Sequence, residues 1–190
     1  MSLLLETAER LLPYLESINV NYWEDTQFKL YRTASNTGKG AYGERFVTDL
    51  LTAKGYNVSK PSNTGHDRIV NGLKLEIKFS LSMTNHKKGL VEVNSFMMNH
   101  LSTDKDFDVL YFLGINRDFS TVEILLTKES FKEIMNTPNQ QYFDPQQGGK
   151  KGKNNDWMCT GKKLMKLYNS DFNMKWKLKN STFLEELKEC

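Results

Sequence analysis

Apolar and polar residues alternate strictly from Leu73 to Phe79. The odd-numbered positions hold leucine, isoleucine or phenylalanine, and the even-numbered positions hold Lys74, Glu76 and Lys78. Because successive side chains of a β-strand point to opposite faces, this period of two predicts a strand with one apolar face and one ionic face.

A tight turn precedes this strand. Asn71-Gly72 is the strongest short hairpin signal, since a two-residue type I′ turn needs positive φ at both central positions. Counting outward from the turn places Asp67 opposite Glu76, with their Cβ atoms roughly 4.5–5.5 Å apart. Lys78 is expected on the same face as these two carboxylates. The hairpin therefore gathers two acids and one lysine on one side.

The rest of the chain shows both helical and strand patterns. Apolar residues at helical spacing predict helices at 4–18, 42–54, 91–101 and 128–135. Short apolar runs predict strands at 56–59, 107–115 and 121–126. The run at 107–115 is almost continuously apolar, so its strand is expected to be covered on both faces. Residues 82–89 are predicted to form a polar loop.

The C-terminal part differs in character. Residues 137–155 are polar and contain proline and glycine. The stretch between Pro145 and Asn180 contains nine lysines and only two acids. Four aromatic residues lie among them: Trp157, Tyr168, Phe172 and Trp176. Two interpretations stay open, a nucleic-acid surface or a solvated basic flank packed by its aromatics. We expect one domain over 1–190, with a core at about 38–136, an extension at 137–190 and a short helix at 182–189.

Composition limits the function classes. The net charge is +3 over 190 residues, so any nucleic-acid footprint must be local. Cys159 and Cys190 are isolated, which argues against zinc and against a disulfide framework. No apolar run reaches the ~20 residues of a membrane span, and Glu6, Glu9 and Arg10 are untypical of a signal peptide. We expect a soluble cytoplasmic protein without a membrane partner.

The hairpin residues suit phosphodiester hydrolysis. Two facing carboxylates repel each other unless a cation lies between them, and Mg²⁺ binds through one or two carboxylates plus substrate phosphates. Asp67 and Glu76 are therefore candidate Mg²⁺ ligands, with the Ile77 carbonyl as a third. Lys78 would orient or deprotonate the attacking water, and Glu44 of the preceding helix could hold a second metal ion or a metal-bound water.

Each of these residues also has a simpler explanation. A Glu-x-Lys pattern is common on solvated strands, and Glu44 near a helix N-terminus is favoured by the helix dipole alone. His66 would point away from Asp67's face in a regular strand, so we interpret it first as a solvent or turn histidine and second as a site residue. Five lysines are candidate DNA-phosphate contacts, with a solvated loop as the alternative: Lys87, Lys88, Lys150, Lys151 and Lys153.

The order of these elements resembles a known superfamily. A helix with Glu44, then Asp67, then Glu76-Ile77-Lys78 across a hairpin is similar to the PD-(D/E)xK nucleases, specifically type II restriction endonucleases. The similarity runs from about residue 38 to 135 and departs at His66, where the motif has proline. The resemblance implies a restriction-endonuclease-like α/β fold, a central mixed β-sheet flanked by helices. It also implies Mg²⁺-dependent cleavage of double-stranded DNA that leaves 5′-phosphate and 3′-hydroxyl ends.

In size the chain is similar to the small cleavage subunit of heterodimeric type IIS restriction enzymes. In that group a large subunit recognises the site and nicks one strand, and the small subunit cuts the other. The sequence has no helix-turn-helix or zinc-finger signature, which fits recognition by a partner subunit. The alternatives are a self-sufficient homodimeric type II restriction endonuclease that pairs with a second copy, a junction resolvase, or a non-catalytic DNA-binding assembly subunit.

Overall fold

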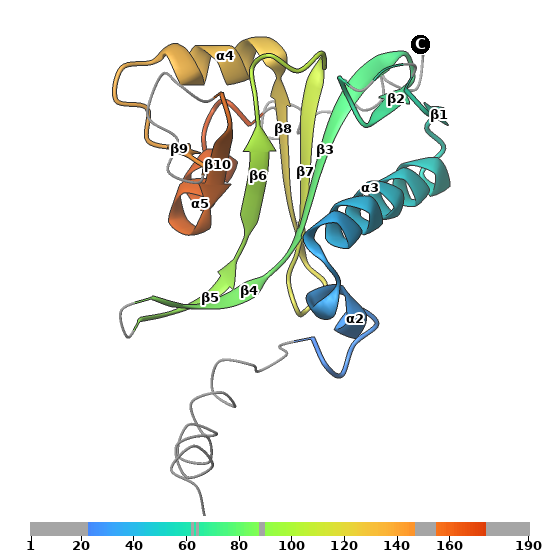
Figure 1. Ribbon diagram of the computed structural model, residues 1–190, viewed down its shortest axis with the longest axis vertical. Helices are drawn as coiled ribbons and strands as arrows, with labels where there is room; N and C mark the ends of the chain where they lie inside the picture. Colours follow the sequence, from blue (N-terminus) through green and yellow to red (C-terminus); the bar gives the residue numbers. More distant parts are fainter. Residues whose placement is uncertain (1–22, 62, 64, 88–89, 147–154, 174–190) are drawn as a thin grey trace, which may run out of the picture. The chain divides into compact units, whose positions relative to one another are not determined.

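The computed structural model describes residues 23–61, 63, 65–87, 90–146 and 155–173, with the backbone alone for 84–87 and 90–94 (Figure 1). The chain forms two compact units, 1–34 and 35–190. The described part of the first contains α2 (Lys29–Thr33) and the ring of Trp23, which lies edge-on to that of Phe28 with centroids 5.4 Å apart. The helix predicted at 4–18 lies outside the described residues.

A five-stranded mixed sheet organises the second unit, in the order β1-β2-β3-β7-β8. Its strands are β1 (Val58–Ser59), β2 (Arg68–Val70), β3 (Leu73–Leu81), β7 (Val109–Ile115) and β8 (Thr121–Thr127). β3 and β7 run parallel, and the other neighbouring strands run antiparallel. Figure 1 shows α3 on one side of the sheet and α4 and α5 on the other. The predicted α/β class, with a mixed sheet flanked by helices, is confirmed.

The predicted hairpin joins β2 to β3. Asn71 and Gly72 have φ of +46° and +86°, the signs that a type I′ turn requires. Arg68 pairs with Leu75 and Val70 pairs with Leu73, so the predicted register is confirmed.

Helix α3 (Asn36–Ala53) packs on the β3 face that contains Phe79. The Ser35 side chain caps the helix by accepting a hydrogen bond from the Gly38 N–H at 3.1 Å, and Gly55 follows its end with φ of +89°. A Cβ added to Gly43 would lie 2.5 Å from Phe79 Cβ. The helix predicted at 42–54 is confirmed and starts earlier than expected.

The opposite side of the sheet holds the main hydrophobic core. All seven residues of β7 are buried, as predicted for a strand covered on both faces. Leu110, Phe112 and Ile124 pack with Phe131 and Ile134 of α4 (Lys128–Asn136). The strand predictions at 107–115 and 121–126 and the helix prediction at 128–135 are confirmed.

Two predictions between residues 82 and 101 are wrong. The expected loop at 82–89 and helix at 91–101 are instead three strands, β4 (Met83–Lys87), β5 (Leu90–Ser95) and β6 (Met97–Leu101). β4 pairs with β5, whereas β6 pairs with β10 (Trp157–Thr160) in a second sheet, ordered β6-β10-β9. Pairing with a segment far along the sequence outweighs the local helical spacing.

The C-terminal extension completes the core. It contains β9 (Asp144–Pro145), β10 and α5 (Gly161–Tyr168). Cys159, Leu164 and Leu167 are fully buried, and three of the predicted aromatic residues pack against the same core: Trp157, Tyr168 and Phe172. These three aromatics therefore pack against the core, as the interpretation of a solvated basic flank expects. The helix predicted at 182–189 lies outside the described residues, and so does Trp176.

Among the residues that the structure describes, no helix is both long and apolar enough to cross a membrane.

Candidate active site

Asp67 lies immediately before β2, beside β3. Its N–H donates to the Leu75 carbonyl at 2.9 Å, and the strand ladder begins at the next residue, Arg68. The cross-strand pair predicted between Asp67 and Glu76 is therefore not part of the ladder. Instead, Asp67 Oδ2 accepts a hydrogen bond from the Ile77 N–H at 2.7 Å. This bond fixes the Asp67 carboxylate beside β3. The carboxylate pairs with an N–H that the backbone of a longer β2 would otherwise bind.

The Ile77 carbonyl points to the same side of β3 as the Ile77 N–H. Within a strand, the N–H and C=O of one residue point toward the same neighbour. Since the Ile77 N–H points at the Asp67 carboxylate, the Ile77 carbonyl also points toward the segment just before β2. The backbone oxygen predicted as a ligand thus lies on the Asp67 side of β3.

Glu76 is buried and holds two lysines. Its side chain is 2% exposed, and Oε1 accepts from Lys78 Nζ at 2.7 Å and from Lys105 Nζ at 2.5 Å. The β3–β7 register pairs Glu76 with Leu110, so Glu76 lies on the main-core side of the sheet. The structure therefore brings Glu76 and Lys78 together, as predicted from their alternation, and adds a second ammonium group.

Lys105 has no sequence signal that would assign it to the site. It lies in the loop between β6 and β7, a segment without apolar periodicity. The parallel pairing of β3 with β7 carries this loop to the start of β3, because Val109 lies beside Leu75. Only a prediction of that parallel register would have located Lys105 near Glu76.

Glu44 approaches from α3, the helix on the opposite side of the sheet. Its Oε2 lies 3.5 Å from Arg68 Nη1, and Arg68 Nε donates to Thr48 Oγ1 at 2.8 Å. Arg68 Nη1 also donates to the Asp67 carbonyl at 2.5 Å. Glu44 therefore already has a protein cation beside it, and its role toward a second metal ion stays a prediction.

The acids of the site influence one another. Burial, followed by the charge of Glu76, raises the pKa of Asp67. Burial, followed by the charge of Asp67, raises the pKa of Glu44. The three carboxylates thus influence one another, and the charges of Arg68, Lys78 and Lys105 partly offset their repulsion.

The oxygen donors suit magnesium better than a metal held by many side chains. Among the described residues, no group of three or more His, Cys, Asp and Glu side chains is arranged to hold a metal ion. Mg²⁺ requires only one or two carboxylates and keeps several waters. The assignment of Asp67, Glu76 and the Ile77 carbonyl as Mg²⁺ ligands stays a prediction.

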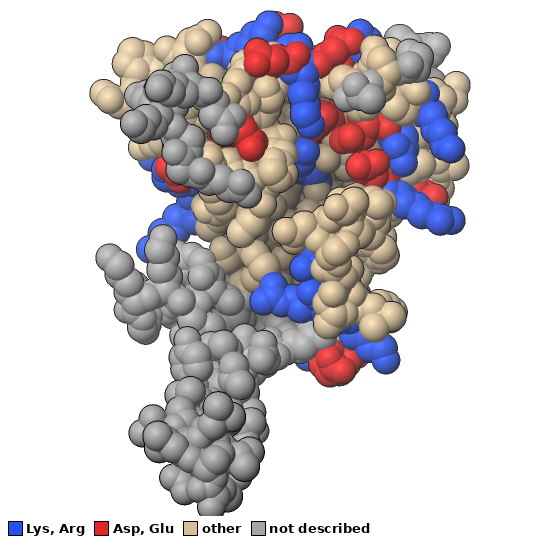
Figure 2. Space-filling view, in the orientation of Figure 1, with Lys and Arg blue, Asp and Glu red and all other residues tan. Residues whose placement is uncertain are grey.

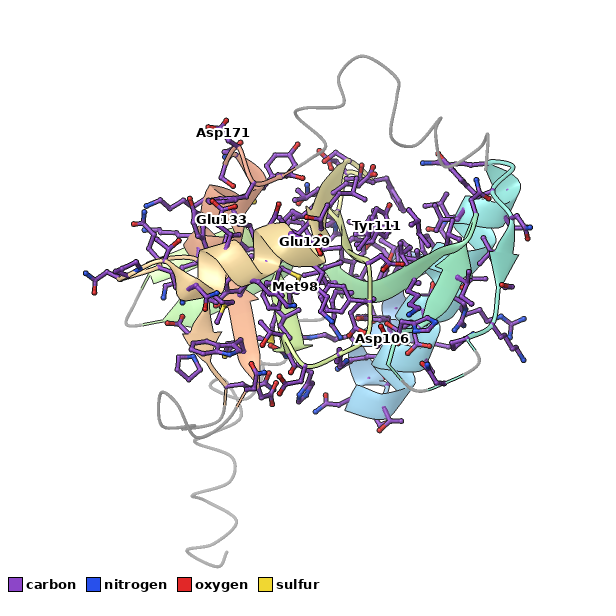
Figure 3. All side chains as sticks on the ribbon, turned by 90° about the horizontal axis from the view of Figure 1, so that it is seen from above. Met98, Asp106, Tyr111, Glu129, Glu133 and Asp171 are labelled. Carbon is purple, nitrogen blue, oxygen red and sulfur yellow. The ribbon has the colours of Figure 1, made fainter. Side chains whose placement is uncertain are left out.

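His66 is buried, in contrast to the prediction of a solvent or turn histidine. It is 4% exposed, and its Nδ1 lies 3.1 Å from the Asp106 carbonyl. The ring therefore joins the Asp67 segment to the loop that contains Lys105. The reason for its burial is the close approach of that loop: a Cβ on Gly65 would lie 2.7 Å from Asp106 Cβ. Asp106 is labelled in Figure 3.

The predicted DNA contacts are largely beyond what the structure describes. Lys87 ends strand β4, whereas Lys88, Lys150, Lys151 and Lys153 lie outside the described residues. Figure 2 shows acidic and basic side chains intermixed on the visible face, without separation into one basic surface. Phosphate contact by these lysines stays a prediction.

Comparisons with known proteins give little further guidance. No known family matches the sequence, and no curated protein does. One solved structure with a similar arrangement is described as a bacterial homing endonuclease, I-Ssp6803I. It is 17% identical and covers 52% of this chain and 70% of its own, with a TM-score of 0.37. At that score the likeness says nothing about the function of this chain.

Proposed function

We propose that this chain is a Mg²⁺-dependent endonuclease that hydrolyses phosphodiester bonds of double-stranded DNA. The observation that carries the proposal is the Asp67 carboxylate held on the Ile77 N–H, next to the buried Glu76–Lys78 pair. Two acids, a backbone carbonyl and an ammonium group thus lie near the middle of β3. A strand whose charges served solubility alone would not bury its glutamate.

Each residue of the site has a distinct task. Asp67, Glu76 and the Ile77 carbonyl would hold the metal ion. When bound, Mg²⁺ supplies Lewis-acid stabilisation of the charge that builds on the phosphoryl oxygens. Lys78 is 17% exposed, so its ammonium group can orient the attacking water and offset the negative charge of the substrate.

We further propose that the chain cuts one strand as the small subunit of a type IIS restriction enzyme, with a larger partner that recognises the site. One site of this kind accommodates one scissile phosphate, so a double-strand break requires a second site. The sequence has no helix-turn-helix or zinc-finger signature. DNA recognition by a partner subunit agrees with both points.

The catalytic assignment is tested by plasmid cleavage in Mg²⁺ against EDTA. Glu76→Ala and Lys78→Ala should each lower cleavage at least about 100-fold with the far-ultraviolet circular dichroism unchanged. Glu133→Gln, an exposed acid on α4 labelled in Figure 3, is the matched control and should cleave like the wild type. Retention of most activity in either alanine variant would refute the assignment.

The subunit assignment needs the product of the neighbouring gene. Cleavage mapped on both strands should be weak for this chain alone. The partner alone should nick one strand, and the second strand should be cut only when both proteins are present. Discrete double-strand fragments from this chain alone would support the homodimer instead. Preferential cleavage of four-way junctions would support a resolvase, and DNA binding without cleavage in every mixture would support an assembly subunit.

A further inference from the structure

Two lysines converge on one oxygen of Glu76. Lys78 Nζ lies 2.7 Å and Lys105 Nζ 2.5 Å from the same Oε1. The charge of Lys105 also acts on Asp67, whose carboxylate it favours in the ionised form. Lys105 therefore occupies the electrostatic position that a cation bound by Asp67 and Glu76 would take.

A bound divalent cation and Lys105 would compete for Glu76. Like charges a few ångströms apart in a site shielded from water repel strongly. Glu76 is almost fully buried, so solvent screens this repulsion only weakly. Either the metal ion binds less tightly than the carboxylates alone would allow, or one lysine leaves.

Lys105 is the lysine that is free to leave. Its side chain is 35% exposed, against 17% for Lys78, and Lys78 is part of the central strand β3. Two contacts hold the backbone at Lys105 and the next residue: Lys128 Nζ donates to the Lys105 carbonyl, and Lys74 Nζ lies 2.9 Å from Asp106 Oδ2. The loop can therefore stay in place while the Lys105 side chain swings outward.

We propose that Lys105 is a displaceable counter-ion that holds Glu76 in the metal-free protein and binds a DNA phosphate once a divalent cation replaces it. This inference rests on the proposed nuclease function. It makes metal binding and substrate binding cooperative, because the metal ion releases the ammonium group that then contacts DNA.

The test is metal binding without DNA, measured by isothermal titration with Mg²⁺. Removal of the competing charge in Lys105→Met should tighten Mg²⁺ binding about five-fold or more, a typical allosteric coupling. Lys105→Arg keeps the charge and should bind like the wild type. Lys163→Met is the matched control, since Lys163 pairs with Asp144 at the same 2.5 Å and is 39% exposed. If Lys105→Met does not fold, Lys105→Gln replaces it.

The second arm measures DNA binding in Ca²⁺ over a range of salt concentrations. Loss of one phosphate contact in Lys105→Met should weaken binding and reduce the slope of log K against log salt by about one. Unchanged or weaker Mg²⁺ binding by Lys105→Met would overturn the proposal. Tighter Mg²⁺ binding with an unchanged salt slope would overturn the phosphate contact and keep the counter-ion. Failure of the proposed function gives a different result, the absence of Mg²⁺ binding in the wild type and in every variant.

Discussion

The Asp67 carboxylate accepts a hydrogen bond from the backbone N–H of Ile77 at 2.7 Å. A side chain thus continues the strand pairing where β2 stops, and a half-buried acid is held near Glu76 by a backbone N–H. The same bond satisfies an N–H that the short β2 would otherwise leave unpaired.

Substitutions at Asp67 should separate its structural part from its charge. Asp67→Ala leaves the Ile77 N–H without its acceptor, and we expect a loss of about 1–3 kcal/mol in the free energy of unfolding. Asp67→Asn keeps a side-chain carbonyl that can accept the bond, and it should retain most of the wild-type stability. Urea denaturation compares the three proteins. Equal stability of both variants would contradict a role for this bond.

The charge of Asp67 should appear in the pH dependence of stability. Burial, and then Glu76, raise the pKa of Asp67 in the folded protein. Such a group contributes stability that is complete below its unfolded pKa of about 4 and is lost as the pH rises through its folded pKa. The metal-free wild type should therefore lose stability relative to Asp67→Asn between pH 4 and pH 7. A stability difference independent of pH, measured by urea denaturation, would argue against the raised pKa.

The contact between α3 and β3 should be sensitive to a single methyl group. A Cβ at Gly43 would overlap the Phe79 side chain, so Gly43→Ala should cost about 1–3 kcal/mol. Gly40 lies in the same helix with no atom within 4 Å of an added Cβ, and Gly40→Ala should stabilise by about 0.5–1 kcal/mol. Thermal denaturation gives both values. Similar shifts for the two variants would contradict the close packing.

Cys159 should serve as a reporter of core opening. It is fully buried, and burial raises the pKa of its thiol to about 12, so the reactive thiolate is scarce at neutral pH. In a Cys190→Ser background, iodoacetamide should leave the folded protein unlabelled for hours and should label it rapidly in denaturing urea. Mass spectrometry measures the labelled fraction, and rapid native labelling would show that β10 is not sealed into the core.

Local chemistry in the sequence was enough to predict the hairpin and its ionic strand. Asn71-Gly72 fixes the turn, and the turn fixes the register that pairs Arg68 with Leu75. The pairing of each residue within this ladder follows from its distance in sequence from the turn. Asp67 departs from the count because β2 ends and its side chain takes over the hydrogen bond.

Features that depend on distant segments could not be predicted in this way. Strand β6 exists because it pairs with β10, far along the chain, and helical spacing at 91–101 gave the wrong element. Lys105 reaches Glu76 through the parallel alignment of β3 with β7. Turn propensity and apolar period carry no information about either juxtaposition.

The burial of α5 bears on how this protein can be shortened or fused. A gene fragment that ends at residue 136 would encode all five strands of the central sheet and every proposed ligand of the metal ion. It would also expose to water the side chains that Leu164 and Leu167 cover, and it would remove Asn173, whose side chain accepts a hydrogen bond from the Leu125 N–H. Any engineered chimera that uses this part of the chain should therefore join its partner after residue 173.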